Sequence, residues 1–310
     1  MKRVALVIPT LNGGRLFEKL ADSINTQTLK NIRVFIIDSS SEDETVAIAL
    51  RSGFRIISIT REEFNHGNTR QLGVELAEDA EYIIFMTQDA VLATSASLEN
   101  LINCFKGSNV GAAYGRQLPH PDSEPIGAHA RFFNYPNKSN IKTIHDINTF
   151  GIKTAFISNS FAAYRKSVLQ SVGGFPADVI LGEDTYVAAK MIISGWNVFY
   201  CSEATVHHSH SYNYIQEFQR YFDIGVFHAR ELWIRKTFGN AEGEGIRFVK
   251  SEIRYLWEEK RKKLIVSAFI RTFLKLAGYK LGFYERLLPI KLKCKVSMHS
   301  KYWFSKKLTL

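Results

Sequence analysis

The sequence predicts an α/β protein with a mainly parallel sheet flanked by helices, followed by a helical and basic C-terminal region. Through residues 4–86, short apolar runs alternate with stretches of helical periodicity. That alternation is typical of βαβ units, whose strands lie parallel in one sheet. The apolar runs lack alternating polar residues, which indicates strands covered by helices on both faces. From residue 214 onward the pattern is helical.

Each element follows from its local pattern. Strands are predicted at residues 4–8, 34–38, 56–59 and 82–86, and helices at 15–26, 44–51 and 68–79. Further along, we expect a strand at 156–164, helices at 165–172 and 183–194, and a strand at 196–200. Residues 119–136 are rich in proline, histidine and aromatic side chains and are expected to form a long loop.

Composition excludes several classes of protein. The 310 residues are 45 % hydrophobic and 23 % charged, as in a folded globular protein and unlike a disordered chain. The three cysteines are far apart in the sequence and include no C-x-x-C pair. They therefore form neither a disulfide framework nor a thiolate zinc site, and a reducing compartment fits best.

The formal net charge of +10 is concentrated at one end of the chain. Residues 1–240 contain 23 basic and 24 acidic side chains, whereas residues 241–310 contain 17 and 6. A basic region beside a near-neutral body favours a polyanionic partner surface. No recognised nucleic-acid-binding motif is present, so we expect a membrane surface and no nucleic acid.

Residues 264–278 carry the pattern of a helix that lies in a membrane interface. An apolar run at 264–270 follows three basic residues, Arg261, Lys262 and Lys263. Its continuation is interrupted by Arg271, Lys275 and Lys280. A membrane crossing needs about 20 predominantly apolar residues, so we expect a cytoplasmic protein without a spanning helix. A core-packing helix or a homodimer interface is the alternative use of this segment.

Two acids follow predicted strands at the edge where ligands bind in open α/β sheets. Asp38 can accept hydrogen bonds from a base or ribose, or it can serve as an ordinary loop or cap carboxylate. Asp89 can ligate Mg²⁺ or Mn²⁺, or it can cap the helix that follows. The turn after the first strand lies at the same edge.

Three further groups are candidates for chemistry. His66, Gly67 and Arg70 open a helix whose first turn suits phosphate, although a simple cap and a solvated arginine would look the same. Glu183 and Asp184 begin another helix, either to stabilise its dipole or to supply a general base. His208 and His210 share one face if the strand that precedes these two histidines continues through them. They can then bind metal or diphosphate, or they form a packed histidine cluster.

Four segments in order resemble family 2 glycosyltransferases of the GT-A fold, across roughly residues 1–220. They are Val-Ile-Pro-Thr-Leu-Asn-Gly-Gly at 7–14, Ile-Ile-Asp-Ser-Ser-Ser-Glu-Asp-Glu-Thr at 36–45, Thr-Gln-Asp-Ala at 87–90 and Gly-Glu-Asp at 182–184. Phe-Asn-His-Gly-Asn-Thr-Arg at 64–70 and His-Ser-His-Ser-Tyr at 208–212 resemble the rhamnosyltransferase branch. Such enzymes use dTDP-L-rhamnose to build O-antigen and related cell-surface polysaccharides.

The resemblance implies a role for each candidate residue. The catalytic base would be Asp184, assisted or oriented by Glu183, and the metal-binding acid would be Asp89. Metal or diphosphate would also contact His208 or His210, and other substrate contacts would come from His66 and Gly67. The nucleotide would be bound by Pro9, Thr10, Asn12, Asp38, Arg70 and Gln88. A catalytic domain would cover residues 1–225, and a helical region for membrane association or dimerisation would cover 226–310.

Two departures from the family pattern bear on function. The first acid of the D-x-D motif is missing, because the local sequence is Thr87-Gln88-Asp89. Metal affinity is then expected to be weak or to depend on bound nucleotide. The Q-x-x-R-W signature of processive synthases is absent, which argues against a processive polymer synthase.

The resemblance also implies a reaction and its partners. We expect a single inverting displacement with Mg²⁺ or Mn²⁺ from dTDP-L-rhamnose to an undecaprenyl-diphosphate-linked saccharide, at the inner face of the bacterial inner membrane. The same fold with a UDP-hexose donor is an alternative. A sugar-nucleotide pyrophosphorylase would need Gly-Thr-Arg after Arg15, which is absent. A non-catalytic membrane scaffold is the remaining alternative, although Asp38, Asp89 and Asp184 argue against it.

Overall fold

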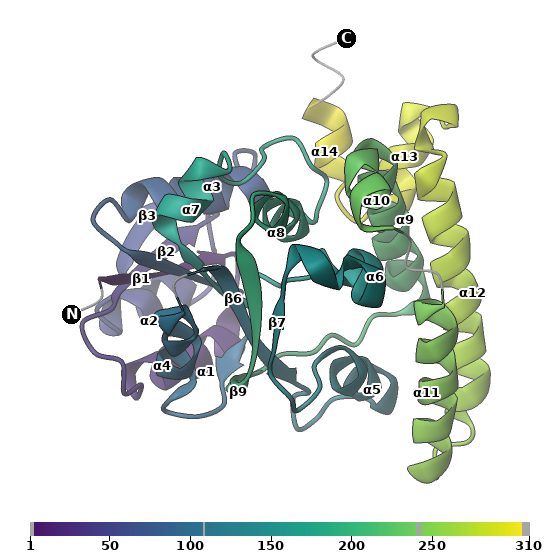
Figure 1. The fold of residues 1–310 in the computed structure, drawn as a ribbon, viewed down its shortest axis with the longest axis horizontal. Helices are drawn as coiled ribbons and strands as arrows, with labels where there is room; N and C mark the ends of the chain where they lie inside the picture. Colours follow the sequence, from purple (N-terminus) through teal and green to yellow (C-terminus); the bar gives the residue numbers. More distant parts are fainter. Residues whose placement is uncertain (1–2, 108, 240–242, 306–310) are drawn as a thin grey trace.

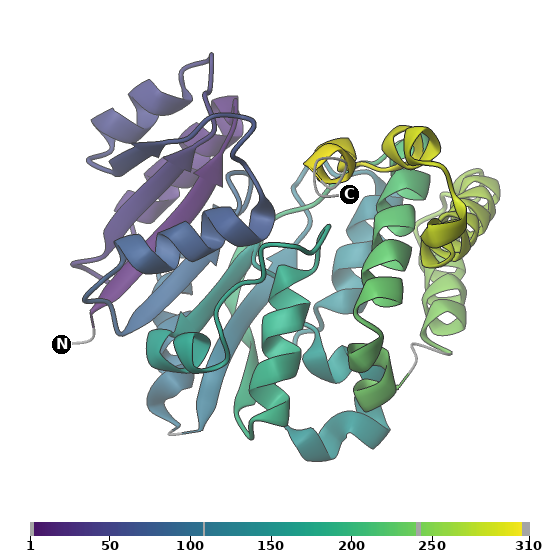
Figure 2. The same cartoon turned by 90° about the horizontal axis from the view of Figure 1, so that it is seen from above.

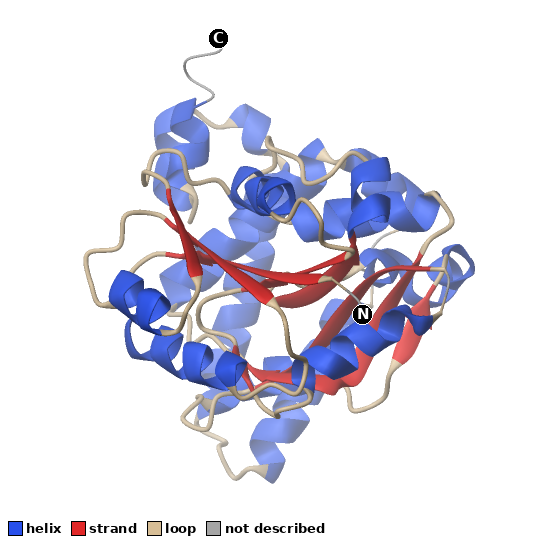
Figure 3. Ribbon diagram, turned by 90° about the vertical axis from the view of Figure 1, so that its left-hand side faces the viewer, coloured by secondary structure: helices blue, strands red, loops and turns tan. Residues whose placement is uncertain are grey.

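The computed structural model describes residues 3–107, 109–239 and 243–305 (Figure 1). Residues 241, 242 and 306–310 of the predicted basic region therefore lie outside the described part of the chain. Within it, the α/β class is confirmed: one central sheet lies between helical layers (Figure 3).

Nine strands of the described residues form the sheet in the order β3-β2-β1-β4-β8-β6-β9-β5, with β7 paired to β9. Six of these strands, β1, β2, β3, β4, β6 and β9, run in one direction. β1 pairs parallel with β2 and β4, β2 pairs parallel with β3, and β6 pairs parallel with β9. β8 lies between β4 and β6 and is antiparallel to both, so β4 and β6 share a direction. The strands are β1 (Val4–Thr10), β2 (Arg33–Asp38), β3 (Arg55–Ser58), β4 (Tyr82–Met86), β5 (Val91–Leu92), β6 (Val110–Leu118), β7 (Asn140–Lys142), β8 (Phe161–Arg165) and β9 (Asn197–His207).

Helices cover both faces of the sheet, as its uniformly apolar strands predict. One core cluster packs the sheet against α1 (Gly14–Asn25), α2 (Thr45–Arg51) and α4 (Ser97–Asn103). The cluster on the opposite face includes side chains of α3 (His66–Leu76), α7 (Lys166–Ser171), α8 (Glu183–Ile193), α9 (Tyr214–Arg230) and α10 (Leu232–Phe238). Every predicted element of residues 4–86 is present, and no end is shifted by more than three residues.

The prediction of a long loop at residues 119–136 is wrong, because this segment contains helix α5 (Pro125–Asn134). Pro125 occupies the first turn, where a missing N–H costs nothing, and Ile126, Ala128 and His129 are buried. His129 packs beside Phe248 of α11 (Glu244–Glu258) with ring centroids 5.0 Å apart. The helix therefore depends on a partner that lies more than a hundred residues later, which the local composition does not reveal.

The C-terminal helices share the main core. The predicted boundary between residues 225 and 226 falls inside α9, a continuous helix whose Phe222, Val226 and Phe227 belong to that core. Ile234, Phe238, Tyr302 and Trp303 join it from later elements. The remaining helices are α6 (Ile147–Phe150), α12 (Leu264–Phe283), α13 (Ile290–Val296) and α14 (Ser300–Ser305), with short 3-10 turns at Cys104–Lys106, Ile144–Asp146, Gly151–Ala155 and Glu285–Leu287.

Helix α12 is the outermost element of the C-terminal layer and lies beside α9 (Figures 1 and 2). Among the helices of the described residues, none combines the length and apolarity that a membrane crossing requires.

Candidate active site

The ends of β1 and β2 meet at one edge of the sheet. In their register, Pro9 is opposite Ile37 and Thr10 is opposite Asp38. Thr10 Oγ1 donates a hydrogen bond to Asp38 Oδ1 at 2.9 Å. The same carboxylate accepts hydrogen bonds from the Ser41 hydroxyl at 2.6 Å and the Ser41 backbone N–H at 2.8 Å. Asp38 therefore holds the loop after β2 against β1, and its contact with a nucleoside stays a prediction.

Gln88 and Asn12 attach the turn after β1 to its neighbours. Gln88 Oε1 accepts from the Leu11 N–H at 2.8 Å, and Gln88 Nε2 donates to the Leu11 carbonyl at 3.0 Å. Asn12 donates its N–H to Ser41 Oγ, and its side-chain oxygen accepts from the Glu42 N–H, both at 2.8 Å. These bonds fix the turn in place. Nucleotide binding by Pro9, Thr10, Asn12 and Gln88 stays a prediction.

Asp89, His208 and His210 form a group of candidate metal ligands after β4 and β9. One ligand atom from each residue lies within 4.8 Å of the others. His208 Nε2 is 3.5 Å from Asp89 Oδ1, and His210 Nδ1 is 3.8 Å from Asp89 Oδ2. Because β9 ends at His207, the histidines do not share a strand face as expected. The loop after the strand turns both toward Asp89 instead.

The protonation states of Asp89 and His210 suit metal binding. Burial raises the pKa of Asp89, but its contacts with His208 and His210 outweigh that effect and hold the pKa below its ordinary value. Burial lowers the pKa of His210 to about 3, so its imidazole is neutral near pH 7. A carboxylate and neutral imidazoles are the forms that coordinate a divalent cation.

Gln117, which the sequence analysis did not single out, orients His208. Gln117 Oε1 lies 2.9 Å from His208 Nδ1 and accepts a hydrogen bond from Arg131 Nη1 at 2.6 Å. Because arginine only donates, the shared atom is the amide oxygen, so His208 Nδ1 carries a proton and Nε2 is the ring nitrogen that faces Asp89. Gln117 is only 1 % exposed within β6. The signal for it was the pair of polar residues, Arg116 and Gln117, near the end of an otherwise apolar and small-residue strand.

We expect Gln117→Met to weaken Mn²⁺ binding by about 10- to 100-fold, because outer-shell partners of a metal-binding histidine typically contribute that much. Methionine preserves the volume but removes the acceptor that selects the tautomer of His208. Titration followed by the electron paramagnetic resonance of free Mn²⁺ measures the change. Gln170→Met, at an exposed position of α7, is the control. Equal Mn²⁺ affinity in the two variants would show that Gln117 does not orient a ligand.

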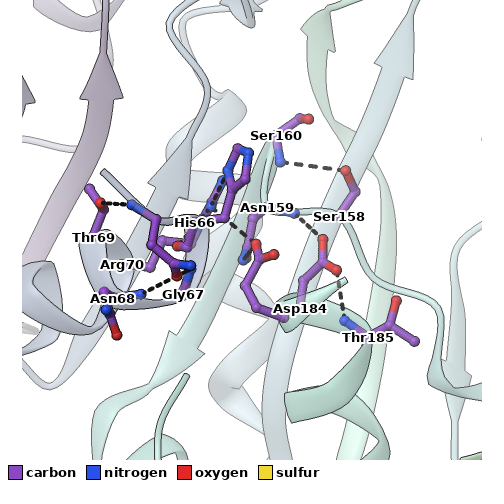
Figure 4. Close-up of polar contacts among 12 residues, drawn as sticks. His66, Gly67, Asn68, Thr69, Arg70, Ser158, Asn159, Ser160, Asp184 and Thr185 are labelled. Carbon is purple, nitrogen blue, oxygen red and sulfur yellow. Dashed lines mark hydrogen bonds and ion pairs between the residues drawn. The ribbon is translucent and has the colours of Figure 1, made fainter. Parts of the chain in front are cut away.

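Asp184 lies in the first turn of α8, and two backbone N–H groups hold its carboxylate (Figure 4). Oδ2 accepts from Asn159 at 3.1 Å, and Oδ1 accepts from Thr185 at 2.7 Å. Burial and the neighbouring charge of Glu183 raise the pKa of Asp184 to about 6. The side chain is only partly buried. Asp184 is therefore an accessible carboxylate that can accept a proton near neutral pH.

Glu183 forms a buried ion pair with Arg70. Glu183 Oε1 is 3.1 Å from Arg70 Nη1, and the two side chains are 7 % and 5 % exposed. Asn159 Nδ2 donates to the same oxygen at 3.2 Å, and Tyr164 donates its hydroxyl proton to Asn159 Oδ1 at 2.7 Å. Burial alone raises the pKa of Glu183, but Arg70, His66 and Asn159 together lower it below its ordinary value. Glu183 thus stays ionised while Asp184 titrates.

The acid pair and the metal-ligand group belong to one site. Asp184 is bonded to Asn159, and the preceding Ser158 accepts a hydrogen bond from Gln117 Nε2 at 3.0 Å. Gln117 in turn contacts His208. The strand expected at 156–164 begins only at Phe161, because the residues before it form the loop that carries these contacts. Asn159 is a further residue that local sequence patterns did not indicate.

The start of α3 differs from the expectation. The helix begins at His66, two residues before the expected start at residue 68, and its cap is Asn65. The Asn65 side chain accepts from the N–H groups of Gly67 and Asn68, at 2.9 and 3.1 Å. A Cβ at Gly67 would lie 1.8 Å from the Pro176 carbonyl oxygen, so this close contact needs glycine. The N–H groups of Gly67 and Asn68, which could otherwise donate to a phosphate, are therefore already occupied. The substrate roles of His66 and Gly67 stay predictions. A diphosphate contact by Arg70 also stays a prediction.

The C-terminal region contributes His299 to this site. The His299 ring packs edge-to-face on His66 with centroids 5.2 Å apart. Asp223 of α9 fixes the segment, since it accepts from the Ser297 hydroxyl at 2.7 Å and from the N–H groups of Met298 and His299 at 2.9 and 3.3 Å. Burial lowers the pKa of His66 to about 3 and that of His299 to about 4, so both rings are neutral near pH 7.

Comparison with known proteins agrees with this geometry. Residues 5–173, more than half of the chain, match the family described as glycosyl transferase family 2. The chain belongs to glycosyl transferase family 2 and is a glycosyltransferase.

Two relatives match over nearly their whole length. The chain is 49 % identical to the O-antigen chain rhamnosyltransferase RfbN of Salmonella typhimurium, over 97 % of this chain and 96 % of the relative. It is 46 % identical to the O-antigen chain rhamnosyltransferase WbaN of Salmonella anatum, over 98 % and 96 %. The resemblance to the rhamnosyltransferase branch is thereby confirmed.

Solved structures confirm the GT-A-like fold. The mannosyltransferase PcManGT from Pyrobaculum calidifontis, solved with GDP-Man and Mn²⁺, superposes with a TM-score of 0.62 at 16 % identity, over 92 % of this chain and 88 % of that chain. S. aureus TarS residues 1–349 superpose with a TM-score of 0.51 at 14 % identity, over 92 % and 91 %. At such identities the likeness concerns the fold alone.

Proposed function

We propose that this glycosyltransferase transfers L-rhamnose from dTDP-L-rhamnose to a lipid-linked saccharide in O-antigen assembly. The observation that carries the proposal is the near-full-length similarity to two O-antigen chain rhamnosyltransferases. The site supports it, because one titrating carboxylate and a group of metal ligands lie at the same sheet edge. An acceptor linked to undecaprenyl diphosphate is part of the proposal.

The reaction needs one base. Asp184 accepts the proton of the acceptor hydroxyl, and the oxygen forms a bond to the anomeric carbon of rhamnose. The bond from that carbon to the diphosphate oxygen breaks on the opposite face, and dTDP leaves with the electron pair. A β-linked donor thus yields an α-L-rhamnoside with inversion. The leaving diphosphate needs charge stabilisation rather than a proton, so a second acid is not required.

Asp89, His208 and His210 would hold a divalent cation, which supplies charge neutralisation for a leaving diphosphate. The donor set fits such an ion, since Gln117 orients His208 so that its Nε2 faces Asp89, and the imidazole of His210 is neutral. Imidazole ligands suit transition metals, whereas Mg²⁺ prefers oxygen. We therefore propose Mn²⁺ ahead of Mg²⁺.

Glu183 and Arg70 keep the base in place. The Arg70 guanidinium neutralises Glu183, so the acid beside Asp184 remains a carboxylate with a fixed position. Asn159 bridges the pair, because its backbone N–H bonds Asp184 and its side chain bonds Glu183. The proton affinity of Asp184 and the direction of its carboxylate are thus set by neighbours that do not need to touch the substrate.

We expect dTDP release from dTDP-L-rhamnose, and much slower release from UDP- and GDP-hexoses, when the full chain is incubated with Mn²⁺ and a lipid-linked acceptor. Chromatography of the released nucleotides measures the outcome. Release from a UDP-sugar alone would retain the transferase chemistry and contradict the rhamnose donor. Asp89→Asn is the matched variant of the metal site. Equal rates of dTDP release with and without Mn²⁺ in the wild-type protein would contradict the metal assignment.

A further inference from the structure

Helix α12 packs on the protein through its smallest residues. Ala268, Gly278 and Gly282 are its buried positions. A Cβ at Gly282 would lie 1.9 Å from the Phe222 carbonyl oxygen, and one at Gly278 would lie 2.4 Å from that of Phe218. The backbones of α12 and α9 therefore approach closely, and no large side chain fits between them. The bulky apolar residues of α12 are left to other faces of the helix.

Two of the three charges that interrupt the apolar sequence of α12, Arg271 and Lys275, point inward, and Lys280 is exposed. Arg271 Nη1 is 3.2 Å from Glu217 Oε1 and Lys275 Nζ is 3.7 Å from Glu217 Oε2, with the two basic side chains 15 % and 17 % exposed. Glu217 belongs to α9 and is buried. Both cations thus pair with Glu217 on the inner side of the helix, so they do not divide its outward side.

The outward side is a continuous apolar stripe, which we call the α12 outer face. It comprises five side chains, each between 44 % and 68 % exposed: Val266, Phe269, Ile270, Phe273 and Leu276. Their spacing of three or four residues places them on one side of the helix. Contiguous exposed apolar surface of this kind marks a site of contact with protein or membrane.

Exposed cations flank both ends of the α12 outer face. Lys260, Arg261, Lys262 and Lys263 precede the helix and outnumber the exposed acids Glu258 and Glu259. Lys280 and Arg286 follow at the other end. A second copy docked on the same face would bring these like charges together. An anionic lipid surface neutralises them, with each basic residue near such a surface strengthening binding by about fivefold.

We propose that the α12 outer face docks on an anionic lipid bilayer, with the helix lying in the plane of the interface. From Val266 to Leu276, a rise of 1.5 Å per residue gives a contact line of roughly 15 Å. Phenylalanines enter the headgroup boundary and the flanking cations bind lipid phosphates, as in amphipathic interfacial helices. Lipid-linked acceptors would be reached from such a position, but the docking itself requires neither donor nor acceptor.

The same helix is bonded to the loop that carries the metal-ligand histidines. Arg271 Nη1 donates to the Tyr212 carbonyl at 2.6 Å, and Tyr214 donates its hydroxyl proton to Ser267 Oγ at 2.9 Å. Tyr212 also packs against His210, with ring centroids 5.1 Å apart. Docking of α12 therefore holds the active-site loop at a fixed distance from the bilayer.

The test is co-sedimentation of the full chain with vesicles of phosphatidylethanolamine and phosphatidylglycerol, without substrates. We expect Phe273→Glu to lower vesicle binding at least tenfold. Leu50→Glu on α2 is the matched control, since Leu50 is 64 % and Phe273 is 68 % exposed and each variant adds one negative charge. Lys262→Gln with Lys263→Gln should weaken binding to these vesicles and reduce its salt dependence. Thermal melting confirms that each variant is folded.

Three results would overturn the proposal: no binding of the wild-type protein to anionic vesicles, equal losses in Phe273→Glu and Leu50→Glu, or a lipid-free dimer that Phe273→Glu dissociates in sedimentation velocity. The last result would assign the face to a second copy. Nucleotide release is measured separately in solution, so failure of the proposed transferase reaction and failure of membrane docking are distinguishable.

Discussion

Replacing Asp184 with asparagine should lower kcat by about 10²- to 10⁴-fold, the usual contribution of a positioned general base. Asparagine keeps the shape of the side chain, and its single amide oxygen can still accept from one of the two N–H groups, of Asn159 and Thr185, that hold Asp184. It cannot take a proton from the acceptor hydroxyl. Binding of dTDP, measured by calorimetry, should change little, because the loss concerns the chemical step.

The pH dependence provides a second readout of the same residue. The pKa of Asp184 is raised to about 6 by burial and by Glu183, and only the carboxylate is an active base. In the wild-type protein, kcat/KM should therefore fall tenfold per pH unit below about pH 6 and level off above it. Residual activity of Asp184→Asn should lack this slope.

Asp22→Asn is the matched control, because Asp22 is an exposed acid of α1. It should retain wild-type kcat and the wild-type pH profile. If Asp184→Asn also retained kcat, the base would have to be another group. If it lost activity together with dTDP binding, the loss would be structural and the assignment of Asp184 would not stand.

The second large effect concerns the ion pair between Arg70 and Glu183. Arg70→Met should reduce the free energy of unfolding by about 3–5 kcal/mol, since it leaves a buried carboxylate without its partner. The charge of Arg70 also lowers the pKa of Asp184. In Arg70→Met the acid limb of the kcat/KM profile should therefore move to higher pH.

A double-mutant cycle separates the pair from its surroundings. Arg70→Met combined with Glu183→Gln should cost less than the sum of the single changes, with a coupling of about 1–3 kcal/mol in urea unfolding. The control cycle uses Arg61 and Glu42, whose side chains are 37 % and 78 % exposed. An exposed pair of this kind couples by about 0.2–1 kcal/mol. Equal coupling in the two cycles would contradict a buried, catalytically linked ion pair.

Several parts of the site follow from short sequence patterns. Buried parallel strands read as continuous apolar runs, and a strand end is marked by the first polar residue after the run. Asp38 and Asp89 were found in this way, and they lie at the carboxyl edge of the sheet. Glu183 and Asp184 were visible because acids in a first helical turn are a local signature.

Other parts depend on residues far apart in the chain. Gln117 matters because β6 lies next to β9 and presents it to His208. Asn159 matters because its loop lies against the start of α8. His299 reaches His66 only because Asp223 anchors the segment that carries it. A local pattern cannot detect such neighbours, because the residues that meet are far apart in the sequence.

The sequence by itself determined the α/β class, the strand ends with their acids and the basic C-terminal region, because periodicity, turn residues and charge act over a few neighbouring residues. Tertiary structure alone decided which partners those residues meet. Arg271 and Lys275 illustrate the difference, since in the sequence they interrupt an apolar helix, whereas in the fold both turn inward to Glu217. The direction of a side chain depends on what packs against its helix, and close packing of α12 on α9 leaves the apolar residues outside.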